Sequence, residues 1–407
     1  MSEPGSTNPF IRYRWLLDSY RQAMTAGWSD SDFLGLVGRL DEAVATVEGH
    51  GFSLTPLTKE PQLAAALGMP TDSLWIKDET GNVAGSHKAR HLFGVLLHHA
   101  IDDASSGELA IASCGNAAVA AAVVARAVER PLRVFIPTWA DETVVALLRR
   151  LEARIEVAER RPGESGDPTY LRFLEAIGVG LIPFSVQSTA TPAALDGGRT
   201  LGWELAEQLA LARVQGIVHL FIQVGGGALA ASTWQGVNDG MREQWLSVEP
   251  ILHTVQTEAA APLNRTWHKL QEHSASLEAI ADWDFSGLGQ FLNDLDLMEP
   301  WEPVGTSSAS GILDDVCYDW VPVTEAMIQS GGRPLVVNES MILKANLLAR
   351  THTEIPVDHT GTAGLSALLD PRLAAEIGPD EHVVVLFTGL DRTHHRQLAT
   401  HNSINSL

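Results

Sequence analysis

The chain has 407 residues, 45% of them hydrophobic, so it can bury a large core and is long enough for two domains. Its 28 basic and 50 acidic side chains give a formal net charge of -22. A surface this acidic repels phosphate backbones, which argues against a nucleic-acid-binding protein.

Three features of the sequence bear on the compartment. Residues 1–8 lack the basic and apolar regions of a signal peptide. A chain of this size does not need the one disulfide that its two cysteines, Cys114 and Cys317, would allow. The most apolar stretch, 109–125, is interrupted by polar residues, so a strand, a turn and a helix are expected there and not a membrane span. We therefore expect a cytoplasmic protein.

Two amphipathic helices are expected at the start of the chain, near residues 12–25 and 32–47. Side chains from Ser29 to Asp32 can cap the second helix, and Gly49 can end it. From residue 74 onward, short apolar runs alternate with longer helical patterns. The expected strands are 74–77, 109–112, 132–136, 155–157, 181–184, 217–224, 253–256 and 383–386, and the expected helices are 117–128, 142–151, 168–176, 228–239 and 262–273. This alternation predicts an α/β fold with twisted, mostly parallel sheets flanked by helices.

A lysine, Lys88, follows the expected strand 74–77 and precedes an apolar run at 92–96. Most lysines are solvated surface groups, so a single lysine is a weak signal. At the start of a buried helix, however, desolvation and the positive helix end lower the pKa of the amine. The amine then becomes nucleophilic and able to form a Schiff base.

A second polar segment, Ser113-Cys114-Gly115-Asn116, follows the expected strand 109–112 and opens an alanine-rich helix. Helix capping alone would explain serine or asparagine there. The same geometry offers backbone N–H groups for a carboxylate and an Asn116 amide that can donate to a ring oxygen. No base partner for Cys114 is evident, so we expect it to be a small buried residue.

A glycine-rich turn follows the expected strand 217–224, where Gly225, Gly226 and Gly227 precede Ala228 at the start of a helix. Such a turn lets backbone N–H groups approach a phosphate.

Thr388 stands directly after the last expected strand. A turn would explain it, but a threonine hydroxyl there can also bond to a pyridine nitrogen. A neutral partner leaves that nitrogen less protonated than a carboxylate would, which favours elimination at the β-carbon over transamination. With Lys88 as the anchoring amine, Asn116 beside a ring oxygen and the glycine turn around a phosphate, the segments together supply what pyridoxal phosphate (PLP) requires.

Several further segments follow the same order as in a known group of enzymes. They are Lys77-Asp78-Glu79, Gly85-Ser86-His87-Lys88, Asp196-Gly197-Gly198-Arg199-Thr200 with Glu204, Val255-Gln256-Thr257-Glu258, and His359-Thr360-Gly361-Thr362-Ala363-Gly364. The set resembles the fold-type II PLP enzymes, which include threonine synthase, threonine and serine dehydratases, cysteine synthase and the tryptophan synthase β subunit. The resemblance spans roughly residues 54 to 391.

The resemblance implies a two-domain fold like that of the tryptophan synthase β subunit, with pyridoxal 5'-phosphate as cofactor. Residues 51–104 and 196–407 would form a large PLP-binding domain, and 105–195 a small domain that closes on the substrate. The cofactor would lie in the cleft between them, and closure would exclude water. Residues 1–50 would form a helical N-terminal extension that serves the interface of a homodimer.

The resemblance also implies roles for single residues. Lys88 would be catalytic, as cofactor anchor and proton shuttle. The other cofactor-binding residues would be Asn116, Gly225, Gly226, Gly227, Ala228 and Thr388, and the substrate-binding residues Ser113, Cys114, Gly115, Asn116 and His87. His87 stands where relatives often have Phe or Val, and its imidazole either acts as an acid or base or simply packs. No acidic cluster follows Glu258, so no metal is expected.

The reaction is less sharply indicated. The glycine turn looks more like the dehydratases, whereas Lys77-Asp78-Glu79 and Asp196–Thr200 look more like threonine synthase. No Arg/Lys cluster for a substrate phosphate is evident near Lys88, although Arg90 is present. We therefore predict β-elimination of a threonine- or serine-type β-hydroxy amino acid, or a bulkier one such as phenylserine, to a 2-oxo acid and ammonia. The alternative is a β- or γ-replacement synthase like threonine synthase or cysteine synthase.

Two alternatives come from other classes. Gly225, Gly227 and Ala230, with Glu249 further on, fit the dinucleotide-binding fingerprint of an oxidoreductase, which would leave Lys88 unexplained. A non-catalytic subunit that binds the cofactor is the other, and the intact lysine argues against it.

Overall fold

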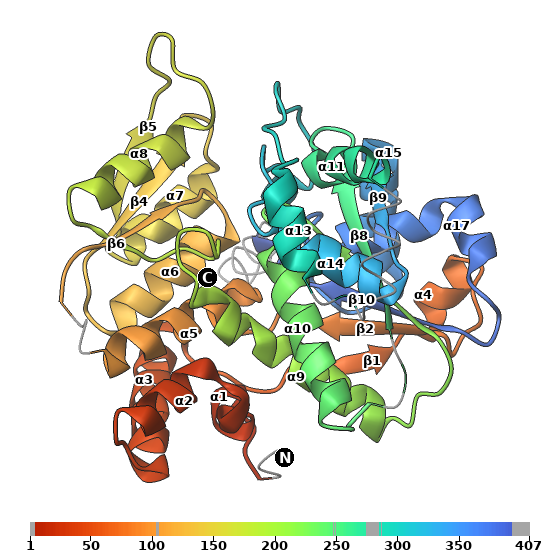
Figure 1. Ribbon diagram of the computed structural model, residues 1–407, viewed down its shortest axis with the longest axis horizontal. Coiled ribbons are helices and arrows are strands. Elements are labelled where there is room, and N and C mark those ends of the chain that lie inside the picture. Colours follow the sequence, from red (N-terminus) through yellow and green to blue (C-terminus); the bar gives the residue numbers. More distant parts are fainter. Residues whose placement is uncertain are drawn as a thin grey trace, which may run out of the picture. The chain divides into compact units, whose positions relative to one another are not determined.

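The computed structural model describes residues 5–102, 106–246, 248, 250–273, 285 and 287–392. Contacts divide the chain into two units, which are described in turn (Figure 1). The first consists of 1–55, 79–200 and 389–407, and the second of 56–78 and 201–388. None of the helices in the described ranges is long and apolar enough to cross a membrane.

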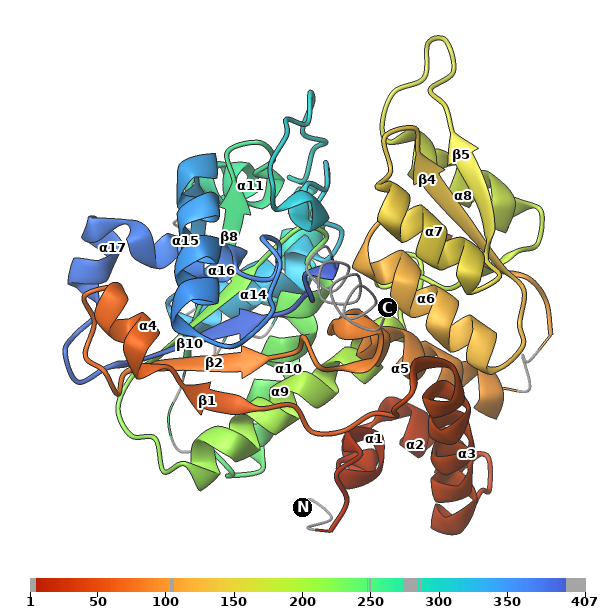
Figure 2. The ribbon, with the colours of Figure 1, turned by 180° about the vertical axis from the view of Figure 1, so that it is seen from behind.

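The first unit contains a small parallel sheet and the N-terminal helices. Its elements are α1 (Pro9–Arg12), η1 (Arg14–Leu16), α2 (Asp18–Thr25), α3 (Asp30–Glu48), η2 (Val83–Gly85), α5 (Lys88–Ile101), β3 (Leu109–Ala112), α6 (Asn116–Ala127), β4 (Leu132–Pro137), α7 (Glu142–Arg150), β5 (Arg154–Ala158), α8 (Pro168–Gly178), β6 (Ile182–Pro183) and the start of α9 (Ala194–Leu211). The strand order is β5-β4-β3-β6, and every pairing is parallel. The opposite views of Figures 1 and 2 show α8 on one face of this sheet and α6 and α7 on the other.

Local signals set the ends of α3 as predicted. Ser29 and Asp32 form a reciprocal capping box, in which the Ser29 Oγ accepts from Asp32 N and an Asp32 carboxylate oxygen accepts from Ser29 N. Gly49 ends the helix in the left-handed conformation, with a φ of 96°.

The second unit contains the larger sheet. Its elements are β1 (Leu57–Lys59), α4 (Pro61–Ala66), β2 (Leu74–Asp78), the rest of α9, β7 (Val218–Gln223), α10 (Ala228–Arg242), β8 (Pro250–Thr257), α11 (Pro262–Gln271), α13 (Leu288–Leu295), η3 (Ser310–Ile312), α14 (Trp320–Ser330), β9 (Pro334–Val337), α15 (Glu339–His352), α16 (Ala363–Ser366), η4 (Ala367–Leu369), α17 (Pro371–Glu376) and β10 (His382–Phe387). The strand order is β1-β2-β10-β7-β8-β9. Only the β1–β2 pair among these strands is antiparallel.

Of the central strands of the larger sheet, β7 is buried over its whole length and β10 from its second residue onward, as two-sided burial in a helix-covered parallel sheet requires. Phe221, Val255, Val385 and Phe387 belong to its core. Because β7 and β10 are parallel neighbours, their carboxyl ends lie side by side. The predicted α/β class with mostly parallel sheets is confirmed. The predicted domain boundaries stay a prediction, because two contact-defined units do not test which segment moves on substrate binding.

Candidate active site

The predicted anchor, Lys88, is the first residue of α5 and is half-buried. The chain turns sharply just before it, where Ala84 and Gly85 have φ values of 57° and 62°. A Cβ on Gly85 would lie only 2.9 Å from Leu390 Cβ, so the close approach there requires glycine. Ser86 is fully buried, and its hydroxyl has no hydrogen-bond partner among the described residues.

Arg90, two residues beyond Lys88, is held by Glu79. Arg90 Nε and Nη2 donate to Glu79 Oε2 and Oε1 at 2.8 and 2.9 Å, and Nη1 donates to Thr200 Oγ1 at 3.1 Å. Asn82 Nδ2 donates to Glu79 Oε2 at 2.7 Å. Arg90 and Glu79 are both buried, so this bidentate pair fixes the turn that leads to Lys88. The guanidinium is therefore committed to the fold and unsuited to binding a substrate phosphate.

His91 lies one turn beyond Lys88 and is electrically neutral. Its Nδ1 is 2.9 Å from the carbonyl oxygen of Ala194, which can only accept, so Nδ1 carries the proton. Burial, followed by the nearby charge of Lys88, lowers the pKa of His91 to about 3. The ring of His87 meets that of His91 edge-on, with 5.8 Å between centroids. His87 is buried and thus has a packing contact, and its role toward a substrate stays a prediction.

The segment Ser113–Asn116 lies where the sequence predicts, between β3 and α6. Ser113 N donates to the carbonyl oxygen of Phe135 at 3.1 Å, and Asn116 is the first residue of α6. Cys114 is half-buried, which corrects the expectation of a buried residue, because the four residues of the turn are all partly exposed. Neither cysteine forms a disulfide.

Arg392, which no sequence pattern indicates, contacts both the turn before Lys88 and the turn at the start of α6. Arg392 Nη1 donates to Asn116 Oδ1, and Nη2 donates to the carbonyl oxygen of Ala84. Because Oδ1 of the Asn116 amide accepts from a guanidinium, the amide is fixed with its NH2 group turned away from Arg392. Leu390 N also donates to the carbonyl oxygen of Gly85 at 2.9 Å. The chain after β10 therefore joins the Lys88 turn to the Asn116 turn.

The segment Asp196–Thr200 supports α5 and does not add a chemical group. A Cβ on Gly197 would lie 2.1 Å from the carbonyl oxygen of Arg90, and a Cβ on Gly94 would lie 2.5 Å from Gly197 N. These two glycines allow α5 and α9 to cross closely. In the second unit, Lys77 Nζ and Glu204 Oε2 form a fully buried ion pair at 2.7 Å.

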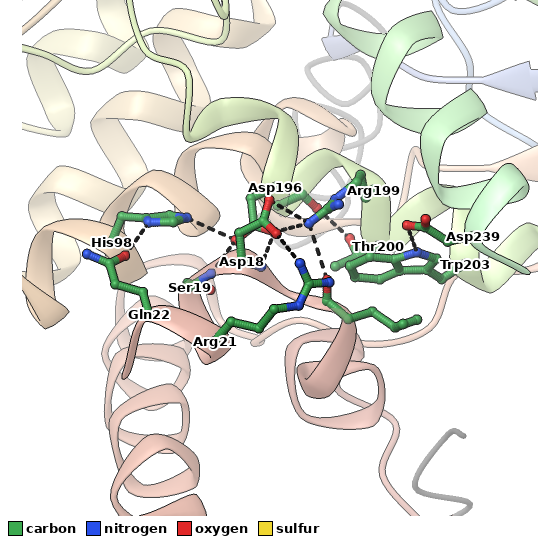
Figure 3. Close-up of polar contacts among 12 residues, drawn as sticks. Asp18, Ser19, Arg21, Gln22, His98, Asp196, Arg199, Thr200, Trp203 and Asp239 are labelled. Carbon is green, nitrogen blue, oxygen red and sulfur yellow. Dashed lines mark hydrogen bonds and ion pairs between the residues drawn. The ribbon is translucent and has the colours of Figure 1, made fainter. Parts of the chain in front are cut away.

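Asp196 binds four groups with its carboxylate (Figure 3). Oδ1 accepts from Asp18 N at 2.8 Å and from Arg199 Nη2 at 2.7 Å, and Oδ2 accepts from Ser19 N and His98 Nε2, both at 3.0 Å. The backbone donors open α2, so Asp196 caps that helix. Burial alone would raise the pKa of Asp196, but these donors outweigh it and lower the pKa below the usual value.

The predicted phosphate cradle lies in the second unit. Gly227 has a φ of 101° and precedes the first residue of α10. A Cβ on Gly227 would lie 3.0 Å from Cys317 Sγ, and a Cβ on Gly225 would lie 2.2 Å from Asp314 Oδ2. The turn is therefore restricted to glycine at both positions, and it leads into the positive end of a long helix.

Thr388 follows β10 and is 2% exposed. Its Oγ1 accepts a hydrogen bond from Gln223 Nε2 at 2.6 Å. Gln223 is the last residue of β7 and lies two residues before Gly225, so the predicted partner of the ring nitrogen and the predicted phosphate cradle belong to neighbouring strand ends. The sequence offered no signal for Gln223, because its partner is 165 residues away.

These residues fit pyridoxal phosphate. In the first unit, Lys88 supplies an amine, and the buried hydroxyl of Ser86 lacks a protein partner among the described residues. In the second unit, taken by itself, the turn before α10 presents backbone to an anion without any Cβ at Gly225 or Gly227. Among the residues that the structure describes, no group of three or more His, Cys, Asp or Glu side chains is arranged to hold a metal ion.

Comparisons with known proteins agree with this fit. The family model described as pyridoxal-phosphate dependent enzyme matches residues 50–389. Cysteate synthase of Methanothrix thermoacetophila is 24% identical over 346 residues, which cover 80% of this chain and 73% of that protein. The biosynthetic L-threonine dehydratase of Haemophilus influenzae is 23% identical over 275 residues, covering 67% of this chain and 50% of that protein. The solved structure of diaminopropionate ammonia lyase from Escherichia coli matches with a TM-score of 0.67 and 16% identity, covering 96% of this chain and 93% of that chain.

The chain belongs to the pyridoxal-phosphate dependent enzymes, and its fold is that of the fold-type II members. Its cofactor is therefore pyridoxal 5'-phosphate. This membership replaces the dinucleotide-binding alternative for the glycine turn. Glu249, on which that alternative also depended, lies outside the described residues.

Proposed function

We propose that the protein is a PLP-dependent ammonia-lyase that carries out β-elimination on a β-hydroxy amino acid of the threonine or serine type. A bulkier substrate such as phenylserine is included in this class. The products are a 2-oxo acid and ammonia. The similarity to an L-threonine dehydratase supports the proposal without fixing the substrate, because the identity is 23%.

The observation that carries the proposal is the hydrogen bond between Thr388 and an uncharged side chain. The Thr388 hydroxyl is bonded to an uncharged amide, that of Gln223, at the carboxyl end of β10. A neutral partner for the ring nitrogen weakens the ring as an electron sink, which favours loss of a β-substituent over transamination. The commitment of Arg90 to Glu79 supports hydroxide over phosphate as the leaving group.

The residues of the candidate site have separate tasks in this proposal. Lys88 would hold the cofactor and move the proton at the α-carbon. Ser113 and the N-terminus of α6 would bind the substrate carboxylate, and Asn116 would donate to the cofactor's ring oxygen. The turn 225–228 would bind the phosphate. When bound, the cofactor supplies an electron sink for the bonds at the α-carbon of an amino acid.

The overall reaction balances without a further reactant. The Cα–H and Cβ–O bonds of the substrate break, and the proton and hydroxide leave as one water. The resulting unsaturated amine then takes up one water, and its nitrogen leaves as ammonium, so that one 2-oxo acid forms for each ammonia.

The test is an absorbance spectrum of the purified protein and of Lys88→Ala, before and after addition of L-threonine, L-serine or L-phenylserine. Wild type should show the band of the covalently held cofactor and release 2-oxo acid and ammonia in equal amounts, whereas Lys88→Ala should lose both. Lys344→Ala, at an exposed position on α15, is the matched control and should resemble wild type. A substrate-induced band that yields product only when a nucleophile is added would show a β-replacement synthase instead.

A further inference from the structure

The turn before Lys88 contains an alanine in an unfavourable conformation. Ala84 is 3% exposed and has a φ of 57° and a ψ of 22°, which is the left-handed region. Alanine disfavours this region because its Cβ crowds the following carbonyl oxygen. Such a conformation persists only where the surrounding contacts hold it. On its carbonyl side, Ala84 accepts a hydrogen bond from Arg392 Nη2.

On its amide side, Ala84 is held by a residue of the N-terminal helices. Glu48 Oε1 accepts a hydrogen bond from Ala84 N at 3.0 Å. The N–H groups on either side of it bond within the turn, because Val83 N donates to Asn82 Oδ1 and Gly85 N to the Asn82 carbonyl oxygen, each at 2.8 Å. The buried N–H of Ala84 therefore depends on an acceptor that comes from a distant part of the chain, and its loss would be costly.

Glu48 occupies a position that its own helix disfavours. It is the last residue of α3, where the helix dipole is negative and a carboxylate is repelled. Helix α3 packs against η2, which contains Ala84, so the carboxylate at the end of α3 lies at the turn. A residue that breaks a local rule and makes a compensating contact elsewhere is typical of a functional position.

We infer that Glu48 is a positioning residue that holds Ala84 in the left-handed conformation and thereby fixes where Lys88 presents its amine. The inference rests on the proposed function, in which Lys88 holds the cofactor. Glu48 acts through the backbone of Ala84, four residues before Lys88, and is not itself a catalytic residue. It gives the N-terminal helices a task inside their own chain, because their last residue helps to build the turn that opens α5.

Two substitutions of Glu48 separate the reach of the side chain from its charge. Glu48→Gln keeps the length and the accepting oxygen but loses the charge. Glu48→Asp keeps the charge but is shorter by one C–C bond, about 1.5 Å, so its carboxylate cannot reach Ala84 N. The inference predicts that Glu48→Gln resembles wild type and that Glu48→Asp does not, whereas a role of the charge alone predicts the reverse. Glu42→Asp, at an exposed position on the same helix, is the matched control.

Two measurements on the full chain report the effect. In cofactor-free protein, hydrogen exchange at the Ala84 amide should be about tenfold faster in Glu48→Asp than in wild type, because the amide has lost its acceptor. After addition of pyridoxal phosphate, the lysine-dependent absorbance band should form about tenfold more slowly in Glu48→Asp. In Glu48→Gln both rates should stay within about threefold of wild type, since a neutral acceptor is weaker than a charged one but still present.

A second substitution tests whether the conformation of the turn is what matters. Glycine adopts the left-handed region without strain, so Ala84→Gly should restore the rate of band formation when it is added to Glu48→Asp. If the rate is not restored, Glu48 contributes to the fold in general, and the inference is wrong.

The other outcomes separate this inference from the proposed function. Equal rates of band formation in Glu48→Asp and wild type would overturn the inference alone, because Lys88 would then not depend on the contact between Glu48 and Ala84. A wild-type protein that forms no lysine-dependent band would overturn the inference and the proposed function together.

Discussion

Asn116 and Arg392 are joined by a hydrogen bond across 276 residues, with the guanidinium as donor and the amide oxygen as acceptor. The bond leaves the NH2 group of Asn116 as the end of the amide that can donate to a ligand. Loss of a charge-assisted hydrogen bond costs about 1.5–3 kcal/mol, so Arg392→Met should weaken cofactor binding about tenfold or more. Absorbance titration of the cofactor-free protein measures this, with Arg350→Met, at an exposed position in the last turn of α15, as control. Equal affinities in Arg392→Met and wild type would contradict the expected role.

The buried pair of Arg90 and Glu79 should matter strongly for stability. Removal of one partner leaves a buried charge uncompensated, so Arg90→Met should lower the free energy of unfolding by about 3–5 kcal/mol. Arg372, whose pair with Asp370 is exposed, offers the matched comparison, and Arg372→Met should change the urea midpoint little. Similar midpoints for the two variants would show that the buried pair is not an anchor.

Asp196 should give the protein a component of stability that acid removes. Its pKa is lower in the folded protein than in the unfolded chain, so the unfolded chain binds the proton first as the pH falls. The contribution is complete above the ordinary pKa of an aspartate, near 4, and is lost as the pH falls toward the lower folded value. Asp196→Asn should therefore cost about 3 kcal/mol at neutral pH, and its difference from wild type should shrink in acid.

Denaturant unfolding of wild type and Asp196→Asn over a series of pH values checks this expectation. Asp380→Asn, at an exposed position, should follow wild type throughout. A stability difference that does not depend on pH would mean that Asp196 contributes through packing and not through its charge.

Gly227→Ala should impair both the fold and the phosphate cradle. The φ of 101° is unfavourable for alanine by about 1–3 kcal/mol, and the new Cβ would lie 3.0 Å from Cys317 Sγ. Gly163 has a comparable φ of 77° with nothing within 4 Å of its Cβ position, so Gly163→Ala carries the strain without the crowding. Thermal unfolding should reveal a loss in both variants, and cofactor titration a loss only in Gly227→Ala. If Gly227→Ala bound the cofactor with the affinity of wild type, the glycine turn would not be the phosphate-binding site.

Much of the fold could be predicted because its signals are local. The expected strand 109–112 has the same ends as β3, the expected helix 117–128 is displaced by one residue at each end from α6, and the expected helix 142–151 is one residue longer than α7. Apolar runs of fixed length and capping side chains lie within a few residues of the element that they define. No strand is expected at β9, because its apolar run has only four residues and begins with a proline, which is too short to indicate a strand at the edge of a sheet.

The candidate site divides in the same way. Lys88, Asn116, the glycine turn and Thr388 were identified because each follows a strand or opens a helix, which a sequence pattern can show. Gln223 and Arg392 were missed, because the contacts that give them meaning are made with residues far away in the chain. Such contacts depend on the strand order and on the path of the chain after β10, and a short stretch of sequence predicts neither.

The cap of α2 has a consequence for the order in which the protein is made. The first backbone N–H groups of that helix, at Asp18 and Ser19, donate to the carboxylate of Asp196, which lies 178 and 177 residues later in the chain. Translation proceeds from the N-terminus, so α2 is synthesised long before Asp196 leaves the ribosome. In a nascent chain that ends before residue 196, α2 lacks this cap and should be less stable. The N-terminal helices should become resistant to protease once synthesis has passed α9.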